Sequence, residues 1–227
     1  MGGQACVLYG AAEFSRDTDV TVLAEAENLR RLQSALAELH AERIAVPPFE
    51  QRYLELGLAV HFRCRQSEAE GQRVDVMSQM RGVAEFPVLW ERRTTLDTQG
   101  ETLELLALPD LVQAKKTQRD KDWPMIARLV EANYHEHYAS PSAEQIEFWF
   151  RELRSPELLL EMATRFRERG QQCVGQRPLL AAAFAADSAA LAQALRGEED
   201  REREADREYW RPLRAELERL RHAARNP

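Results

Sequence analysis

Alternation of apolar and polar residues predicts short strands and an amphipathic helix in the N-terminal half of the chain. Residues 17–23 begin with acidic residues at alternate positions and continue as a β-branched, apolar run, so we expect a strand over residues 18–23. Residues 58–64 alternate in part, and residues 73–77 resemble a second short strand. Spacings of three and four predict a helix over residues 28–43. Its apolar face consists of Leu29, Leu32, Leu36 and Leu39.

A glycine pair precedes the first helix-compatible segment of the chain. Gly2 and Gly3 lie before this segment, Gly10 is a stop signal, and residues 10–16 are expected to form a loop. Glycines before a helix allow the backbone to approach an anion, and the free N–H groups of the first turn can bind phosphate oxygens. The alternative is an ordinary flexible N-terminus.

From about residue 140 the pattern is helical throughout. Ser140 or Ser142 is a helix cap, with Pro141 near the first turn. We expect breaks at Ser155-Pro156, at residues 170–177 and at Gly197. The predicted helices cover residues 142–152, 156–169, 178–195 and 199–224.

The last predicted helix is dense in charges of both signs, which is typical of a solvated helix. It also carries an apolar stripe, which must lie against the body of the protein, a partner or a second copy of the chain. The stripe consists of Tyr209, Trp210, Leu213, Leu217 and Leu220.

Composition indicates a globular protein of 227 residues, with 44% hydrophobic and 30% charged residues. A net charge of -7 argues against non-specific coating of nucleic acid or of an anionic membrane. The chain shows neither a membrane-spanning run nor a signal segment, so we expect a cytoplasmic protein. Cys6, Cys64 and Cys173 are widely spaced and are interpreted as reduced thiols.

Asp17 and Asp19 are the first candidates for chemistry. Because side chains alternate between the faces of a strand, the two carboxylates point the same way. Like charges held this close need a cation, a shared proton or open water. Asp75 lies between two valines in a later strand, where a carboxylate adds little to stability and is costly to bury unpaired.

These residues together resemble a known family. Gly2-Gly3, followed after 13 residues by Asp17-x-Asp19 and later by Val74-Asp75-Val76, is similar to the signature of the nucleotidyltransferase superfamily. That superfamily includes DNA polymerase β and the small bacterial minimal nucleotidyltransferases. The resemblance implies an α/β (α+β) fold with a small mixed sheet, followed here by a helical C-terminal region.

The most similar subgroup contains bacterial nucleotidyltransferase-like proteins, among them abortive-infection toxins. Gly10 matches a glycine of this subgroup, and Ser15 stands where threonine is usual. Residues 102–108 correspond to a short strand that leads into a lysine-bearing helix at residues 109–116. In this family an apolar strand precedes the glycine pair; we therefore expect either that the reading frame begins upstream of Met1 or that the glycine loop lacks that anchor.

The resemblance implies a site for two Mg²⁺ ions and a nucleoside triphosphate. Asp17 and Asp19 would hold the ions against the phosphates. Asp75 would join one ion and favour deprotonation of an acceptor hydroxyl, which attacks the α-phosphate.

The resemblance also implies a cradle for the departing pyrophosphate. It would consist of the N–H groups of Gly2 and Gly3, the hydroxyl of Ser15 and the ammonium of Lys115. Further candidates for phosphate or acceptor contact are Lys116, Arg119 and Lys121. The alternative for these cations is a solvated helix face.

The histidines are weaker candidates. His135 and His137 would face apart on a helix, so packing near the helix end is preferred to a metal site. His61 could line the site near Asp75, but a packed neutral histidine is the preferred interpretation.

We therefore expect a nucleotidyltransferase-like core at residues 1–139 and a helical region at residues 140–227. The expected activity is transfer of a nucleoside monophosphate to a hydroxyl of RNA, protein or a small molecule. One version is a toxin that acts on transfer RNA or a partner protein and is paired with an antitoxin. The alternative is a catalytically weak binding or regulatory module that acts through its helical tail, with homo-oligomerisation through the same helices.

Overall fold

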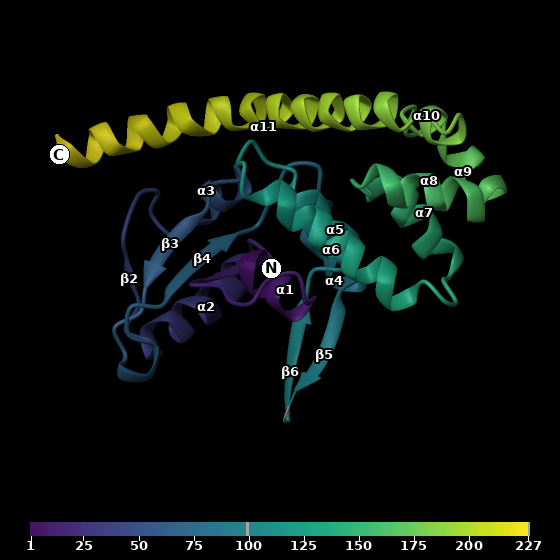
Figure 1. Cartoon of the computed structure of the whole chain (residues 1–227). Coiled ribbons are helices and arrows are strands. Elements are labelled where there is room, and N and C mark those ends of the chain that lie inside the picture. Colours follow the sequence, from purple (N-terminus) through teal and green to yellow (C-terminus); the bar gives the residue numbers. More distant parts are fainter. Residues whose placement is uncertain (99, 227) are drawn as a thin grey trace. The chain divides into compact units, whose positions relative to one another are not determined.

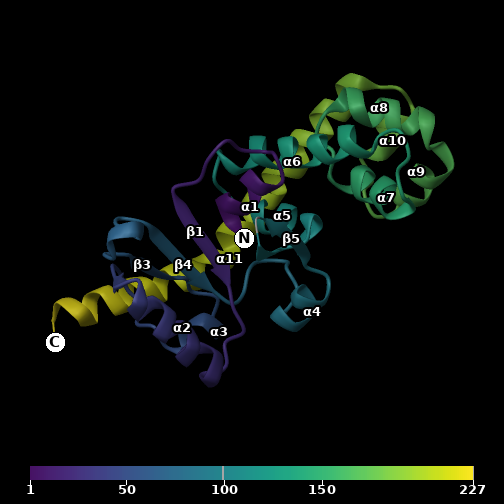
Figure 2. The ribbon, with the colours of Figure 1, turned by 90° about the horizontal axis from the view of Figure 1, so that it is seen from below.

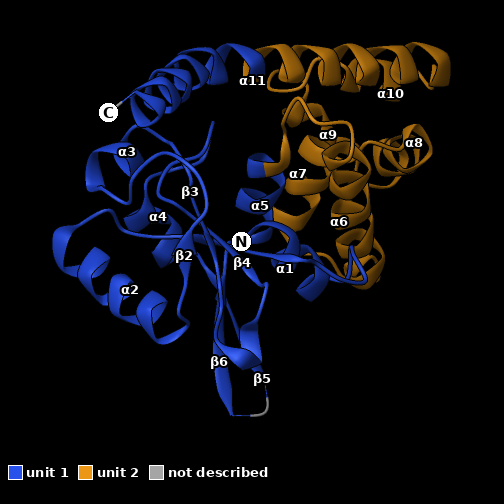
Figure 3. Cartoon of the chain, turned by 90° about the vertical axis from the view of Figure 1, so that its left-hand side faces the viewer, with its two compact units in different colours: residues 1–114, 207–227 blue, residues 115–206 orange. Residues whose placement is uncertain are grey.

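The computed structural model describes residues 1–98 and 100–226 and has a mixed α/β fold (Figure 1). This confirms the expected fold class, with a small mixed sheet and a helical C-terminal region. The chain divides into two compact units, residues 1–114 with the segment from 207 onward, and residues 115–206 (Figure 3). The expected division between residues 139 and 140 stays a prediction.

The first unit is built on a four-stranded sheet with the order β1-β4-β3-β2. Strands β1, β4 and β3 are labelled in Figure 2. β1 and β4 are parallel, whereas β3 is antiparallel to both β4 and β2. The predicted strand at residues 73–77 is confirmed with the same bounds. The strands are β1 (Asp17–Thr21), β2 (Glu42–Arg43), β3 (Val60–Arg63) and β4 (Arg73–Met77).

One face of this sheet forms the core with helix α2 (Ala26–Glu38). Leu29 and Leu36 of α2 are buried, as the spacing predicted. The helix ends earlier than expected, because His40 adopts a φ of 48° and the chain turns into β2. From the strands the core takes the even-numbered residues Val20, Val22, Val60, Phe62, Val74 and Val76.

Helix α1 (Gly2–Leu8) precedes β1 and ends before Gly10, which has a φ of 74°. Ala5 and Cys6 of α1 are buried. The hydroxyl of Tyr9 lies 2.9 Å from the carbonyl oxygen of Leu106 and 2.7 Å from the hydroxyl of Thr94. These contacts hold the end of α1 against the β5–β6 hairpin.

Several elements of the first unit were not anticipated. They include the antiparallel hairpin of β5 and β6 and a bidentate ion pair between Arg92 and buried Asp110. The strand expected at residues 102–108 is shorter, and α5 begins where it was expected to end. The elements are α3 (Gln51–Glu55), the 3-10 turn η1 (Ser67–Ala69), α4 (Phe86–Glu91), β5 (Thr94–Thr98), β6 (Glu101–Leu105) and α5 (Leu108–Lys115).

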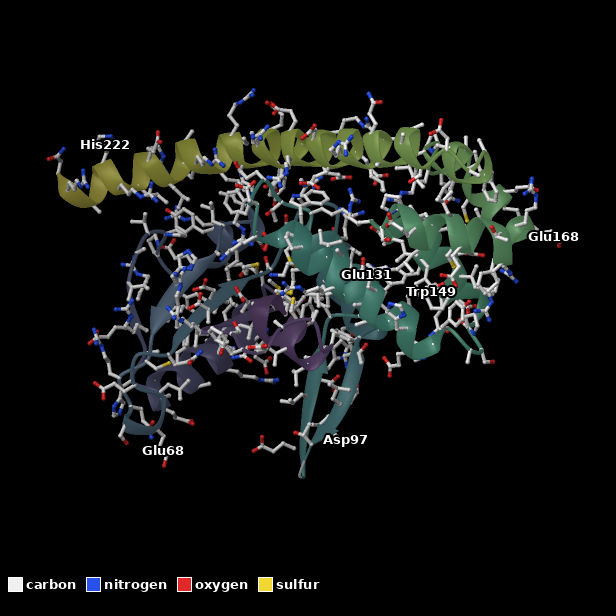
Figure 4. All side chains as sticks on the ribbon, in the orientation of Figure 1. Glu68, Asp97, Glu131, Trp149, Glu168 and His222 are labelled. Carbon is white, nitrogen blue, oxygen red and sulfur yellow. The ribbon has the colours of Figure 1, made fainter. Side chains whose placement is uncertain are left out.

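The second unit is helical. Ser142 caps α7 through a capping box with Gln145. Trp149 is fully buried and donates to the side-chain oxygen of Asn133 at 2.9 Å (Figure 4). Its helices are α6 (Asp122–His137), α7 (Ala143–Glu152), α8 (Pro156–Arg165), α9 (Arg167–Cys173), α10 (Leu180–Phe184) and the first part of α11 (Ser188–Arg225).

The predicted helix boundaries are wrong at three places. Phe166, with φ -120° and ψ 43°, divides the helix expected at residues 156–169. Ala186, with a φ of 55°, separates α10 from α11. Gly197 does not break the chain, because α11 continues through it. The next residue, Glu198, binds Arg177 and Arg154, which holds the helix at this point.

The apolar stripe of α11 lies on the first unit. Leu213 packs with Tyr53 and Leu58, and the other stripe residues surround them. Gly57 has a φ of 89°, and a Cβ atom there would lie 2.6 Å from the hydroxyl oxygen of Tyr209. The stripe thus covers the body of the protein, which was one of the three expected outcomes. Over the described residues, no helix is both long and apolar enough to span a bilayer.

Candidate functional site

The candidate site is the face of the sheet opposite α2. Because the even-numbered strand residues enter the core, the odd-numbered ones point to the other side. The strand register places Asp19, Asp75 and His61 in one row across β1, β4 and β3. A second row consists of Asp17, Arg73 and Arg63. The fold therefore brings the three predicted carboxylates to one surface, which we call the acidic face.

Asp75 lies at the centre of the acidic face and its side chain is only 10% exposed. Its Oδ1 atom accepts from Nε of Arg73 at 2.7 Å and lies 2.8 Å from Nδ1 of His61. Burial raises the pKa of Asp75, but the hydrogen bonds from His61 and Arg73 outweigh it and leave the pKa below its ordinary value. Asp75 is thus ionised at neutral pH.

His61 binds one of two competing partners. Its Nδ1 atom lies 2.8 Å from Oδ1 of Asp75 and 3.1 Å from a terminal nitrogen of Arg73. A guanidinium only donates and a carboxylate only accepts, so Nδ1 can serve only one of them at a time. Donation to the carboxylate is the stronger, charge-assisted bond. His61 therefore lies on the acidic face in contact with Asp75, although the sequence favoured a packed histidine.

Gly2 and Gly3 lie against Asp19. The N–H of Gly3 donates to Oδ2 of Asp19 at 3.2 Å. The ammonium of Met1 donates to the backbone carbonyl oxygen of Asp19 at 2.8 Å. A Cβ atom on Gly2, whose φ is 66°, would lie 1.9 Å from Oδ2 of Asp19. Gly2 is therefore required by its closeness to the carboxylate of Asp19. The expected contact of the glycine pair with phosphate stays a prediction.

Ser15 fixes the start of β1. Its hydroxyl donates to the carbonyl oxygen of Asp17 at 2.9 Å. A Cβ atom on Gly3 would lie 2.3 Å from that hydroxyl oxygen, so the loop before β1 packs tightly on α1. Ser15 thus orients the acidic pair, and its predicted contact with pyrophosphate is untested.

The acidic face retains free ligand atoms. Among the described residues, Asp17 has no side-chain hydrogen bond, Asp19 accepts only at Oδ2 and Asp75 only at Oδ1. Each carboxylate thus keeps at least one oxygen for a further partner. The described part of the chain holds no cluster of three or more His, Cys, Asp or Glu side chains arranged to bind a metal ion.

The predicted phosphate-binding cations belong to the second unit and form ion pairs there. Lys115 lies 3.6 Å from buried Asp122, whose other oxygen accepts from Arg119 at 2.7 Å. Lys116 pairs with Glu152 at 2.8 Å. Lys121 is exposed next to the start of α6. Their contact with a nucleotide held by the first unit stays a prediction.

The other histidine pair does not form a site. His135 stacks edge-on against Tyr134, and His137 lies 3.7 Å from Glu136. Neither belongs to a metal-binding group among the residues described. Packing at the end of α6 is the interpretation that the sequence favoured.

Sequence reasoning missed Arg73. The available signal was the alternation Arg73-Val74-Asp75, which places the guanidinium and the carboxylate on one face of a strand. The register with His61 could not be read from the sequence, because β3 and β4 are joined by a loop whose length leaves the pairing open.

Comparison with models of protein families, with curated proteins and with solved structures gave no match. The functional assignment therefore depends on the geometry of the acidic face.

Proposed function

We propose that this protein is a metal-dependent nucleotidyltransferase, which moves a nucleoside monophosphate from a triphosphate to a hydroxyl acceptor. The observation that supports this most is the register of β1 and β4. It places Asp19 beside Asp75, with Asp17 two residues away on the same face. Carboxylates arranged on adjacent parallel strands gather negative charge, which a bound cation would compensate.

The donor set suits Mg²⁺, because the three residues offer hard carboxylate oxygens that are free of other hydrogen bonds. Asp17, Asp19 and Asp75 would hold the ion. When bound, Mg²⁺ would neutralise the charge of the triphosphate and polarise the transferred phosphoryl group.

The protein's own groups orient the reaction. Before the ion binds, His61 and Arg73 fix the carboxylate of Asp75 through Oδ1, which leaves Oδ2 free to hold the ion. The N–H of Gly3 fixes Asp19 through Oδ2 in the same way. Both carboxylates are thus oriented before substrate binds, which reduces the reorganisation needed in the transition state.

The test is transfer of label from α-labelled nucleoside triphosphates in the presence of Mg²⁺, with RNA and protein as acceptors. Asp19→Asn and Asp75→Asn should each abolish transfer while circular dichroism stays unchanged. Asp97→Asn, on the exposed hairpin, is the matched control and should retain transfer. Equal transfer by wild type and Asp75→Asn would overturn the assignment.

The identity of the acceptor determines the biological role of the proposed transferase. Transfer to transfer RNA or to a partner protein would make the chain a toxin, and an antitoxin would be its second partner. Co-expression with neighbouring open reading frames, followed by growth measurement, separates a toxin from a metabolic enzyme. Cytoplasmic location is part of the same proposal.

A second candidate is a catalytically weak binding or regulatory module. It is favoured by one observation, the ion pair of Arg73 with Asp75, which supplies the acidic face with a cation of its own. Calorimetric titration with Mg²⁺ and each of the four nucleoside triphosphates distinguishes the two. Absence of nucleotide binding would support this module.

A further inference from the structure

The acidic face already contains a positive charge. Arg73 lies in the same row as Asp17 and one position from the row of Asp19 and Asp75. Its Nε atom donates to Asp75 at 2.7 Å. The guanidinium therefore binds the buried carboxylate at the centre of the acidic face.

The side chain of Arg73 can move away from Asp75 into solvent. Its side chain is 37% exposed, whereas that of Asp75 is 10% exposed. A long, partly exposed arginine can swing into solvent at little cost, because its charge is then hydrated. The carboxylate cannot follow it, since it is buried on β4.

Asp75 would not be left without a partner after this movement. Nδ1 of His61 lies 2.8 Å from Oδ1 of Asp75, the oxygen to which Arg73 donates. Nδ1 also lies 3.1 Å from a terminal nitrogen of Arg73. Once the guanidinium is gone, Nδ1 is free to donate to Asp75 without competition from Arg73. His61 thus keeps the carboxylate oriented in both states.

We infer that Arg73 is the resident counter-ion of the acidic face and that a divalent cation binds there by displacing its guanidinium from Asp75. This inference rests on the proposed function, because it assumes that the acidic face is a cation site. It assigns to Arg73 a positioning role: the residue holds the carboxylates together before the ion arrives and lowers the affinity for that ion.

The consequence is that removing Arg73 should tighten metal binding. A neighbouring positive charge repels a bound cation, and the repulsion is stronger at a partly buried site than in water. The expected effect of Arg73→Gln is therefore an affinity about tenfold higher than that of wild type. A residue that only stabilised the fold would leave the affinity unchanged or lower it.

Arg63 provides the matched control. It lies in the same row as Arg73, one strand further from β1, and is exposed without a contact to Asp75 among the described residues. Arg63→Gln removes the same charge from the same face. It should leave the affinity close to that of wild type, because the inferred effect requires contact with the carboxylate.

The experiment is titration of the purified full chain with Mn²⁺ alone, in which the electron paramagnetic resonance signal of free Mn²⁺ reports binding. We expect binding about tenfold tighter for Arg73→Gln than for wild type and Arg63→Gln, and weaker for Asp75→Asn in either background. Added MgCl₂ should also raise the melting temperature of Arg73→Gln more than that of wild type. Should Arg73→Gln not fold, Arg73→Lys replaces it, with a tightening of about threefold from the lost Nε donor.

The outcomes separate the two proposals. Mn²⁺ binding by wild type that is equal or weaker in Arg73→Gln overturns the role of Arg73 and leaves the proposed function in place. Absence of Mn²⁺ binding in wild type and in both arginine variants overturns the cation site itself, and with it both proposals.

Discussion

Gly2 and Asp19 are in direct contact across the start of the fold, since a Cβ atom on Gly2 would lie 1.9 Å from Oδ2 of Asp19. The backbone of Gly2 also has a φ of 66°, which disfavours any side chain. The identity of this residue is thus fixed by the carboxylate beside it.

Gly2→Ala should therefore displace Asp19 as well as strain the backbone. We expect a loss of about 1–3 kcal/mol of stability from the strained conformation and the clash, together with weaker Mn²⁺ binding. Urea denaturation and the Mn²⁺ titration measure the two effects. Gly71→Ala is the control, because Gly71 has a φ of 79° with nothing within 4 Å of its Cβ position. If both variants bound Mn²⁺ equally, the contact with Asp19 would not matter.

The buried ion cluster of the second unit should determine much of its stability. Glu198 accepts from Arg177 at 2.8 Å and from Arg154 at 2.9 Å, and these arginine side chains are 5% and 9% exposed. Glu198→Gln leaves buried guanidinium groups without a counter-charge, so we expect a loss of about 3–5 kcal/mol in the free energy of unfolding. Glu218→Gln, at an exposed position of the same helix, should change it little. Urea denaturation followed by circular dichroism provides the measurement.

The same cluster predicts acid sensitivity. Burial raises the pKa of Glu198, but the hydrogen bond and charge of Arg177, with Arg154 adding, bring it below its ordinary value. A carboxylate with a lowered pKa in the folded state contributes stability above the unfolded pKa, and this contribution is lost as the pH falls through the folded value. Wild type should therefore lose more stability than Glu198→Gln when the pH is lowered from neutral to below about 4. Parallel loss in both proteins would exclude this cause.

The apolar stripe of α11 should be part of the first unit in solution. Leu213 is 8% exposed and packs with Tyr53 and Leu58. Leu213→Ala should cost about 2–4 kcal/mol through lost burial and a cavity, whereas Glu218→Ala on the exposed side of the helix should not. Thermal denaturation measures the difference. An unchanged melting temperature for Leu213→Ala would mean that the stripe does not cover this unit in solution.

The elements that the sequence predicts well are those with an unambiguous period. β4 has the predicted bounds, because Val74 and Val76 flank a single acidic residue. A strand was expected near β6, but β5 and its pairing with β6 were not predicted, because exposed Thr95, Asp97 and Glu104 give no apolar face. A glycine inside a helix costs about 1 kcal/mol relative to alanine, so Gly197 suggested a break. The ion pairs of Glu198 outweigh this cost.

The candidate site was predictable as a set of residue types but not as an arrangement. Alternation along a strand is enough to place Asp17 and Asp19 on one face. The pairing of Asp19 with Asp75, and of Asp75 with His61, depends on the registers of β1, β4 and β3, which are set by tertiary packing. The contact of Arg73 with Asp75 follows from local spacing, yet its consequence for cation binding required the whole face.

The most direct test of the proposed function compares two labels on the same nucleoside triphosphate. With Mg²⁺ and a hydroxyl acceptor, nucleotidyl transfer predicts that the α-label becomes bound to the acceptor and that the γ-label is released as pyrophosphate. Wild type and Asp97→Asn should show both results. Asp19→Asn should show neither. Transfer of the γ-label to the acceptor, or transfer of the α-label that persists in Asp19→Asn, would contradict the account.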